Sequence, residues 1–213
     1  PKPLLRAGGK ALIEWHVYAL ARAGIENVIV NTAHLGEQIE AALSDGARFG
    51  VRIVYSRETS ALETAGGIAN ALPLLGNAPF IVVNGDIVCD FNFAALRERA
   101  SELARVDALA YLVLVDNPEH HPQGDFAVCD DRIVEQGEAL QTFSGIALYQ
   151  PALFRDVKLG QRAALAPLLR QAMRAGAVRG EHYRGLWLDV GTPERLALAD
   201  RLLARFPEVN SAR

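Results

Sequence analysis

The hydrophobic and polar positions of the chain follow two alternating periods, one typical of helices and one typical of strands. Apolar residues recur with helical spacing over residues 11–23, 35–43, 65–72, 93–105, 159–174 and 192–205. Short apolar or β-branched runs between these segments predict strands over residues 27–31, 51–55, 79–83, 109–115 and 186–190. Strands that alternate with helices are typical of a mainly parallel sheet with helices on both faces. The pattern therefore predicts an α/β fold.

Residues 116–148 depart from this alternation, with proline, glycine, histidine and aspartate between short strand-like pieces. Such pieces predict hairpins or a small antiparallel extension of the sheet. Two prolines are expected to limit helices, because proline lacks the N–H that a helix interior requires. Pro73 should close the third helix, and Pro167 should break the helix of residues 159–174. We expect residues 1–213 to form a single domain that contains the region 116–148.

The composition excludes several classes of protein. The 213 residues are 50% hydrophobic and 22% charged, with a net charge of −3 and no basic run that would suit a nucleic acid. The longest apolar run, residues 108–115, is far shorter than the roughly 20 residues of a membrane span. Cys89 and Cys129 are too few for a disulfide framework. We therefore expect a cytoplasmic protein that binds neither nucleic acid nor membrane, with a monomer favoured and the oligomeric state otherwise open.

One candidate site follows the apolar strand of residues 79–83. Asn84, Gly85 and Asp86 come directly after it, and in sheets of this kind ligands bind outside the carboxyl ends of the strands. A glycine beside a carboxylate also lets a ligand approach the backbone closely. The alternative is a simple turn in which Asp86 caps the following segment.

A second candidate is Asp189, which interrupts the apolar strand of residues 186–190. The next three residues need no function, because Thr192 suits a helix N-cap, Pro193 the first turn and Glu194 the positive helix end. A carboxylate within an apolar strand does need a partner. A metal ion would serve, and Mg²⁺ characteristically takes one or two carboxylates together with substrate phosphates.

Other polar features carry less weight on their own. Residues 61–68 form a small-residue turn into a helix that could bind a phosphate or a base, but a helix capped by Thr64 explains them equally. Lys2 offers one ammonium to a phosphate, although a surface lysine is the simpler interpretation. His120 and His121 are adjacent, and neighbours in an extended segment point in opposite directions, so they should not share one metal ion.

Taken together, these segments resemble the sugar-1-phosphate nucleotidyltransferase family. Residues 1–4 (PKPL), 62–65 (LETA), 84–86 (NGD) and 187–193 (WLDVGTP) match its motifs in order and spacing over essentially the whole chain. Glu63 stands where the family usually has glycine. The resemblance implies a Rossmann-like nucleotidyltransferase fold, Mg²⁺ as cofactor, and a nucleoside triphosphate and a sugar 1-phosphate as substrates.

Longer stretches are similar to one branch of that family, the uridylyltransferases of cell-wall recycling. They are residues 114–126, 142–154, 165–173 and 180–196. This resemblance implies that UTP and N-acetylmuramate 1-phosphate give UDP-N-acetylmuramate and pyrophosphate. The alternatives are a mannose-1-phosphate guanylyltransferase-like enzyme or another nucleotidyltransferase of the family, and, in a different class, a non-catalytic nucleotide-sugar-binding protein. A glycosyltransferase would need a D-x-D pair, which Asp86 and Asp90 do not form.

The resemblance also implies roles for particular residues. Asp86 and Asp189 would hold Mg²⁺ and, with Lys2, carry catalysis. The nucleotide would meet Glu63, Thr64, Gly67, Asn84 and Gly85. The sugar would meet Gly124, Asp125, Ser144 and Gly145, within the region 116–148.

Two departures from the family affect these expectations. The family has a strand and a GxGxR-type glycine-rich loop just upstream of PKPL, and neither occurs within residues 1–213. The chain starts at Pro1 and its one methionine is Met173, so we expect residues to precede Pro1 and a polypeptide that truly starts there to be nearly inactive. The acidic–basic EK pair of the sugar-binding hairpin is also missing, and Glu135-Gln136 is the nearest stretch.

Overall fold

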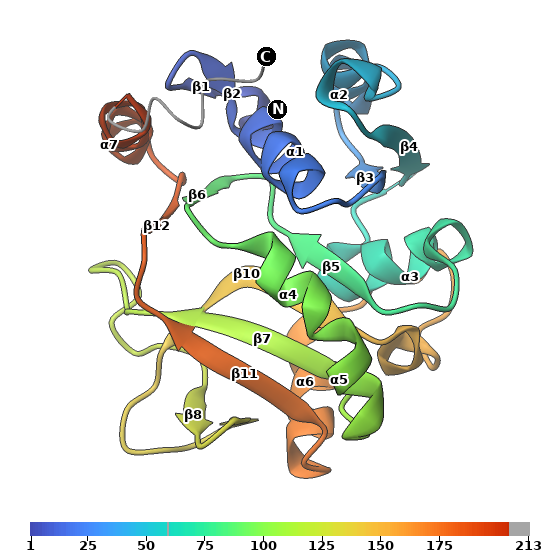
Figure 1. Cartoon of the computed structure of the whole chain (residues 1–213), viewed down its shortest axis with the longest axis vertical. Helices are drawn as coiled ribbons and strands as arrows, with labels where there is room; N and C mark the ends of the chain where they lie inside the picture. Colours follow the sequence, from blue (N-terminus) through green and yellow to red (C-terminus); the bar gives the residue numbers. More distant parts are fainter. Residues whose placement is uncertain (59, 205–213) are drawn as a thin grey trace.

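The computed structural model describes residues 1–58 and 60–204. Its helices are α1 (Leu12–Arg22), α2 (Gly36–Leu43), α3 (Glu63–Leu75), α4 (Phe93–Glu98), α5 (Ala100–Arg105), α6 (Leu165–Arg174) and α7 (Pro193–Leu203), with 3-10 turns η1 (Lys2–Leu4), η2 (Ala47–Phe49) and η3 (Pro151–Phe154). Its strands are β1 (Arg6–Ala7), β2 (Lys10–Ala11), β3 (Asn27–Thr32), β4 (Arg52–Arg57), β5 (Phe80–Val83), β6 (Ile87–Cys89), β7 (Ala110–Val115), β8 (Ala127–Cys129), β9 (Arg132–Val134), β10 (Thr142–Tyr149), β11 (Val178–Tyr183) and β12 (Trp187–Asp189). Figure 1 shows helices on both faces of the sheet, which confirms the predicted α/β class.

The largest sheet has six strands in the order β5-β10-β7-β11-β9-β8. Strands β7 and β11 run parallel, whereas β10 pairs antiparallel with both β5 and β7. The prediction of hairpins between 116 and 148 is right for β8 and β9, which form an antiparallel pair. It is wrong for residues 142–149, which form a central strand of the sheet. Seven of the eight residues of β10 are buried, as neighbours on both sides and on both faces require.

Strand β7 separates two hydrophobic cores. Its six residues are all buried, as the continuous apolar run predicts. Tyr111 and Val113 pack with residues of α4 and α5, and Leu112 and Leu114 pack with residues of α6 on the other face. Each fully buried leucine contributes roughly 2 kcal/mol to folding. The strand thus fixes the helices on both sides of the sheet, and its end leads into the region 116–126.

Strands β3 and β4 form a separate parallel pair. Within the described ranges, β3 pairs with β4 alone and β5 with β10 alone, so each has an open edge. Both edges line one groove of about 690 Å³, which we call the β3–β5 groove. It is bounded by residues 27–31 and 79–85, together with side chains of α1 and α3. The groove reaches Asn84 and Gly85, the residues that precede Asp86.

Three expected helix boundaries are wrong. Pro73 lies inside α3, near its end, where one missing N–H costs little, and Gly76 N still bonds to Leu72 O at 3.1 Å. Pro167 does not break a helix, because α6 starts only at Leu165 and the first N–H groups of a helix have no partner within it. Residues 93–105 form two helices, α4 and α5, which meet at Arg99.

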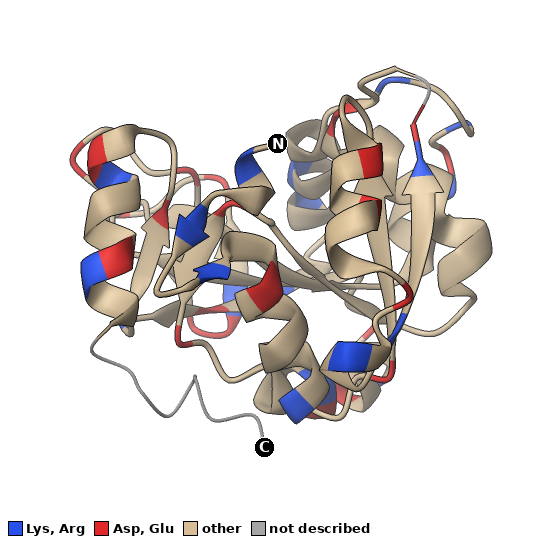
Figure 2. Ribbon diagram, turned by 90° about the horizontal axis from the view of Figure 1, so that it is seen from above, with Lys and Arg blue, Asp and Glu red and all other residues tan. Residues whose placement is uncertain are grey.

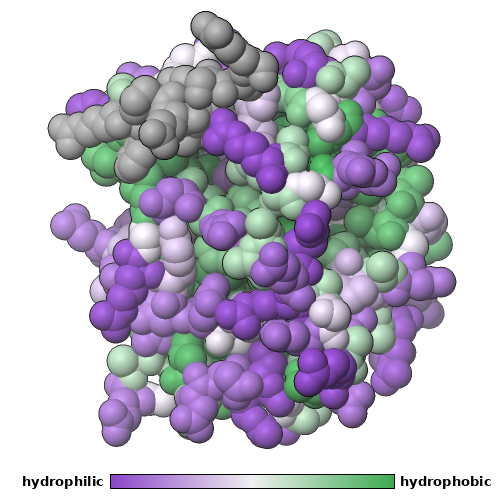
Figure 3. Space-filling view, viewed as in Figure 1, coloured by the Kyte–Doolittle hydropathy of each residue, from purple (hydrophilic) through white to green (hydrophobic). Residues whose placement is uncertain are grey.

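The described surface is mixed in character. Acidic and basic positions are interspersed around the ribbon in Figure 2. Polar residues cover most of the face in Figure 3, with apolar patches between them in its upper half. Cys89 and Cys129 are free thiols. Of the helices in residues 1–58 and 60–204, none is long and apolar enough to cross a membrane.

Candidate active site

The antiparallel pair of β6 and β12 brings the two predicted aspartates together. In its register Asp189 faces Ile87, and Val190 N donates a 2.8 Å hydrogen bond to Asp86 O. Asp86 therefore precedes β6 at the point where Asp189 ends β12. Both carboxylates are partly exposed, at 37% and 30% of their side chains. Two residues that are far apart in sequence thus form one acidic centre.

Lys2 is the cation next to Asp86. Its Nζ donates a 3.0 Å hydrogen bond to Asp86 Oδ2. The turn η1 holds this end of the chain, with Leu5 N bonded to Lys2 O at 3.0 Å. Because both side chains are solvent-accessible, the pair contributes about 0–1 kcal/mol to stability. The structure thus places the predicted lysine beside the predicted aspartate. Because this pairing is weak, the ammonium is available to a phosphate.

Arg195 and His120 are the partners of Asp189. Arg195 Nη1 lies 2.9 Å from both carboxylate oxygens, and His120 Nε2 lies 3.2 Å from Oδ1. Arg195 belongs to the first turn of α7, where Thr192 Oγ1 accepts from Arg195 N at 3.3 Å and confirms the predicted cap. Sequence reasoning identified the need of Asp189 for a partner but missed Arg195. The available signal was a cation in the first turn of a helix, where the dipole disfavours positive charge.

The residues predicted to meet a nucleotide gather at the β3–β5 groove. Glu63, Thr64, Gly67, Asn84 and Gly85 all line it. Thr64 is not the N-cap, because α3 starts one residue earlier, at Glu63. A Cβ at Gly67 would lie only 2.5 Å from Glu58 Oε1, so a side chain there would clash with the Glu58 carboxylate. The other oxygen of that carboxylate accepts a 3.0 Å hydrogen bond from Leu62 N. Glu58 is a groove residue that the sequence motifs did not reveal.

Glu63 adopts a backbone conformation that favours glycine. Its φ is +60°, in the left-handed region that costs a residue with a side chain roughly 1–2 kcal/mol. An ion pair between its carboxylate and Arg162, at 2.6 Å, partly offsets that cost. The geometry explains in physical terms why a glycine suits this turn.

Two of the residues predicted to meet the sugar, Ser144 and Gly145, lie at an irregularity in β10. The register against β7 shifts between Phe143 and Ile146, and Gly145 has a φ of +78°. The Ser144 hydroxyl is buried, donates to Val113 O at 2.6 Å and accepts from Ile146 N at 3.1 Å. The backbone oxygen of Ser144 accepts from Trp187 Nε1 at 2.9 Å. Bulges of this kind often lie beside active sites.

Asp125 ties the loop of residues 116–126 to β10. Its Oδ2 accepts from Phe143 N at 2.8 Å, and its Oδ1 lies 3.1 Å from His121 Nε2. His121 and His120 therefore face different carboxylates, as expected for adjacent residues. Gly124 has a φ of +65°, which a glycine adopts freely. Glu135, the nearest counterpart of the missing EK pair, is instead bonded to Arg174 of α6 at 2.8 Å.

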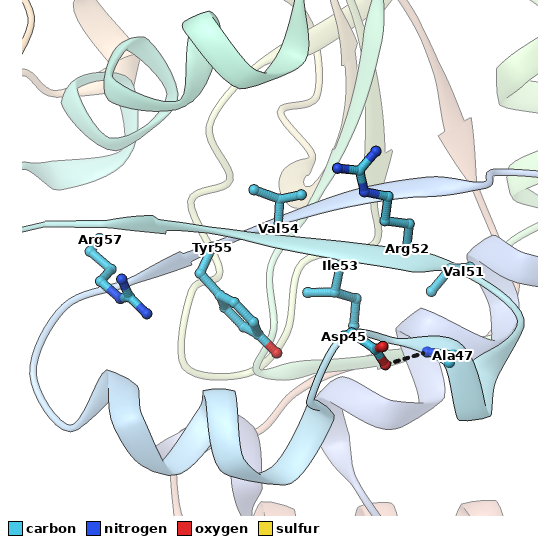
Figure 4. Close-up of a pocket in the computed structure, with 8 residues that line it drawn as sticks. All are labelled: Asp45, Ala47, Val51, Arg52, Ile53, Val54, Tyr55 and Arg57. Carbon is cyan, nitrogen blue, oxygen red and sulfur yellow. Dashed lines mark hydrogen bonds between the residues drawn. The ribbon is translucent and has the colours of Figure 1, made fainter.

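Another hollow lies along β4, away from these residues (Figure 4). Its volume is about 650 Å³, and its lining contains none of the predicted site residues. Two of its charged side chains already have partners, with Asp45 Oδ1 accepting from Ala47 N at 3.1 Å and Arg57 bonded to Glu40. The candidate active site is therefore the one at Asp86 and Asp189.

Comparison with known proteins decides the family. Residues 1–205 match the family described as Nucleotidyl transferase. The chain belongs to this family. It is 50% identical over 207 residues to the N-acetylmuramate alpha-1-phosphate uridylyltransferase of Neisseria meningitidis serogroup B, a match that covers 95% of this chain and 89% of the relative. The resemblance seen in the motifs is thereby confirmed.

More distant proteins resemble the chain in sequence or in fold. The catalytic subunit beta of mannose-1-phosphate guanylyltransferase from Danio rerio is 27% identical over 91% of this chain, which spans 56% of that relative. A crystal structure named as a glucose-1-phosphate thymidylyltransferase from Bacillus anthracis superposes with a TM-score of 0.82 at 21% identity, covering 95% of this chain and 86% of that one. The superposition supports the Rossmann-like nucleotidyltransferase fold.

The donor set of this nucleotidyl transferase suits the Mg²⁺ that the motifs imply. Asp86 and Asp189 offer hard oxygen ligands from adjacent backbone positions, and each carboxylate is open enough to gain further ligands. No group of three or more histidine, cysteine, aspartate or glutamate side chains in the described ranges could hold a metal alone. Substrate phosphates would therefore have to complete the coordination, as Mg²⁺ sites commonly require.

Proposed function

We propose that this nucleotidyl transferase forms UDP-N-acetylmuramate and pyrophosphate from UTP and N-acetylmuramate 1-phosphate. The observation that carries the proposal is the acidic centre of Asp86 and Asp189 beside a groove lined by the expected nucleotide residues. The choice of uridylyl transfer and of N-acetylmuramate is supported by the 50% identity to a relative with that name over nearly the whole chain.

The reaction needs positioning and charge neutralisation more than covalent help from the protein. A phosphate oxygen of the sugar 1-phosphate attacks the α-phosphorus of UTP, and the bond from that phosphorus to the bridging oxygen breaks to release pyrophosphate. The attacking phosphate is already ionised at pH 7, so no general base is required. Phosphoryl-type transfers depend chiefly on alignment and on neutralising phosphate charge.

Asp86 and Asp189 would hold Mg²⁺, which when bound supplies positive charge against the phosphates and favours an in-line approach. Lys2 would exchange its weak pairing with Asp86 for a phosphate oxygen. Glu63, Thr64, Gly67, Asn84 and Gly85 would position the nucleotide along the groove. Gly124, Asp125, Ser144 and Gly145 would position the sugar, with Ser144 acting through its backbone.

We also propose that an extended segment occupies the β3–β5 groove, between the two open strand edges. Unpaired strand edges beside apolar side chains are suited to pairing with another strand. The family's strand and glycine-rich loop fit this position. A polypeptide in which the family's strand and glycine-rich loop are fused ahead of Pro1 should then turn over faster and melt at a higher temperature than residues 1–213 alone. Equal rates of the two would contradict this assignment.

Residues 1–213 are proposed as one nucleotidyltransferase domain, with the region 116–148 on the sugar side. The free thiols of Cys89 and Cys129 suit a cytoplasmic location, where cysteines stay reduced. A monomer is proposed as the working unit. Sedimentation of the purified protein at several concentrations would test whether it is a monomer. If it dimerises, its average molar mass will rise with concentration.

A matrix of substrates tests the proposed function. Pyrophosphate release by the intact protein with Mg²⁺ would be measured for UTP, GTP, dTTP and CTP against the 1-phosphates of N-acetylmuramate, N-acetylglucosamine, glucose and mannose. We expect a clear preference for UTP with N-acetylmuramate 1-phosphate. Preference for GTP with mannose 1-phosphate would instead favour the guanylyltransferase-like reaction. No pyrophosphate with any pair, together with binding of UDP-sugars, would favour a non-catalytic binding protein.

A further inference from the structure

We propose that Arg195, supported by His120, binds the phosphate of the sugar 1-phosphate and so positions its attacking oxygen. This assignment rests on the proposed nucleotidyl transfer, because it names a residue that holds the acceptor. It does not depend on which base or which sugar the protein prefers.

The first argument is the position of the guanidinium. Arg195 Nη1 lies 2.9 Å from both oxygens of Asp189 and 2.6 Å from His120 Nε2. Helix α7 supplies Arg195 and the loop of residues 116–126 supplies His120, so two distant segments converge on one carboxylate. On the other side of the acidic centre, Lys2 contacts Asp86. The two carboxylates thus have separate cations, and an acceptor phosphate beside Asp189 would meet Arg195.

The second argument is unused hydrogen-bonding capacity. Arginine has five N–H donors, and the hydrogen bonds of the Arg195 side chain all come from Nη1. Its Nε is buried without a hydrogen-bond partner in the described structure. A buried donor left unpaired is destabilising, because it has lost its water without gaining another partner. A phosphate that accepted from this guanidinium could satisfy donors that Asp189 leaves free.

A structural ion pair elsewhere in the chain shows the contrast. Arg57 meets Glu40 with two nitrogens on two oxygens, from Nε to Oε1 at 2.7 Å and from Nη2 to Oε2 at 2.6 Å. That forked arrangement is the favoured geometry for an arginine–carboxylate pair. Arg195 instead presents one nitrogen to both oxygens of Asp189. Asp189 therefore occupies only one nitrogen of the Arg195 guanidinium, whereas Glu40 occupies two nitrogens of Arg57.

The third argument is the location at the start of α7. A cation in the first turn of a helix is disfavoured by the dipole, whereas a phosphate there is favoured. Arg195 is the third residue of α7, and its side chain is 22% exposed. The arginine fork and the positive helix end would therefore act on the same anion, and the bound phosphate would offset the unfavourable placement of the cation.

Steady-state kinetics on the intact protein would test the assignment, with whichever triphosphate and sugar 1-phosphate the wild type uses best. The variants are Arg195→Gln, Arg195→Lys and His120→Gln, and Arg57→Gln is the matched control. We expect Arg195→Gln to raise KM for the sugar phosphate about tenfold or more, since a charge-assisted phosphate contact is lost. Arg195→Lys should recover part of this loss, and His120→Gln should have a smaller effect. KM for the triphosphate and the Mg²⁺ concentration for half-maximal rate should stay within about twofold.

The opposite pattern would overturn the assignment. If Arg195 only holds Asp189, then Arg195→Gln will shift the Mg²⁺ requirement and leave KM for the sugar phosphate unchanged. Calorimetric titration of the sugar 1-phosphate, in the presence of Mg²⁺ and a non-reactive triphosphate analogue, gives a readout independent of turnover. Wild-type protein should bind and Arg195→Gln should bind about tenfold more weakly. Equal binding by both, or no binding by the wild type, would also refute the role. A wild type that prefers another substrate pair would change the proposed function and leave this test intact.

Discussion

The carbonyl oxygen of Gly145 accepts a 3.0 Å hydrogen bond from the backbone N–H of Asn84. This contact joins the bulge of β10 to the segment that leads into Asp86. The predicted sugar side and the predicted nucleotide side of the site therefore share one backbone junction. Gly145 also has a φ of +78°, and a side chain there would overlap the side chain of Asn84.

Gly145→Ala should lower the free energy of unfolding by about 2–4 kcal/mol, from backbone strain together with the clash against Asn84. Gly160→Ala is the matched control, because Gly160 has a φ of +71° and no atom lies within 4 Å of the position that its Cβ would take. Urea denaturation of both variants separates the two effects. Equal losses of unfolding free energy in the two variants would mean that the Asn84 side chain moves aside at little cost.

Glu63→Gly should be more stable than Glu63→Ala by roughly 1 kcal/mol, because only glycine relieves the positive φ at this position. Both variants lose the ion pair with Arg162, so that loss cancels in the comparison. Chemical denaturation is again the measurement. An alanine variant as stable as the glycine variant would show that residue 63 is not held in the left-handed region.

Burial lowers the pKa of His16 from 6.5 to about 4, against the opposing effect of its hydrogen bond to Ile87 O. Between these two values the unfolded chain binds more protons than the folded chain, so stability falls as the pH is lowered through that window. We expect this group to remove about 2 kcal/mol between pH 7 and pH 5.

Unfolding at both pH values would be compared for wild type and His16→Gln, which keeps a donor for Ile87 O. The variant should lose less stability on acidification than the wild type. His34→Gln, at an exposed position, should behave like the wild type. The same pH dependence in all three proteins would show that His16 is not the responsible group.

The elements with strong local patterns were predictable from the sequence. A pattern of a few residues was enough to predict the apolar run of β7 and the helix cap at Thr192. The same is true of the positions of Asp86 and Asp189 beside apolar strands. Strand β10 was mistaken for part of a hairpin because its central position depends on pairing with β5 and β7, which lie elsewhere in the sequence. Arg195 was overlooked for a similar reason. The helix start explained its neighbours completely, and only the folded chain brings His120 and Asp189 to it.

The acidic centre is the core of the proposed mechanism, and Asp189→Asn and Asp86→Asn test it with little change in volume. Asn cannot carry the charge that a metal and two phosphates require, so turnover should fall by about 100-fold or more. Glu40→Gln, which removes a carboxylate from an ion pair away from the site, should retain activity.

The most direct measurement is the rate of pyrophosphate release from UTP and N-acetylmuramate 1-phosphate by these three variants and the wild type, at saturating Mg²⁺. Thermal unfolding would be followed in parallel to establish that each variant is folded. The account predicts that the two site variants are folded and nearly inactive while Glu40→Gln stays active. A folded Asp86→Asn or Asp189→Asn protein that turns over at a near wild-type rate would contradict it.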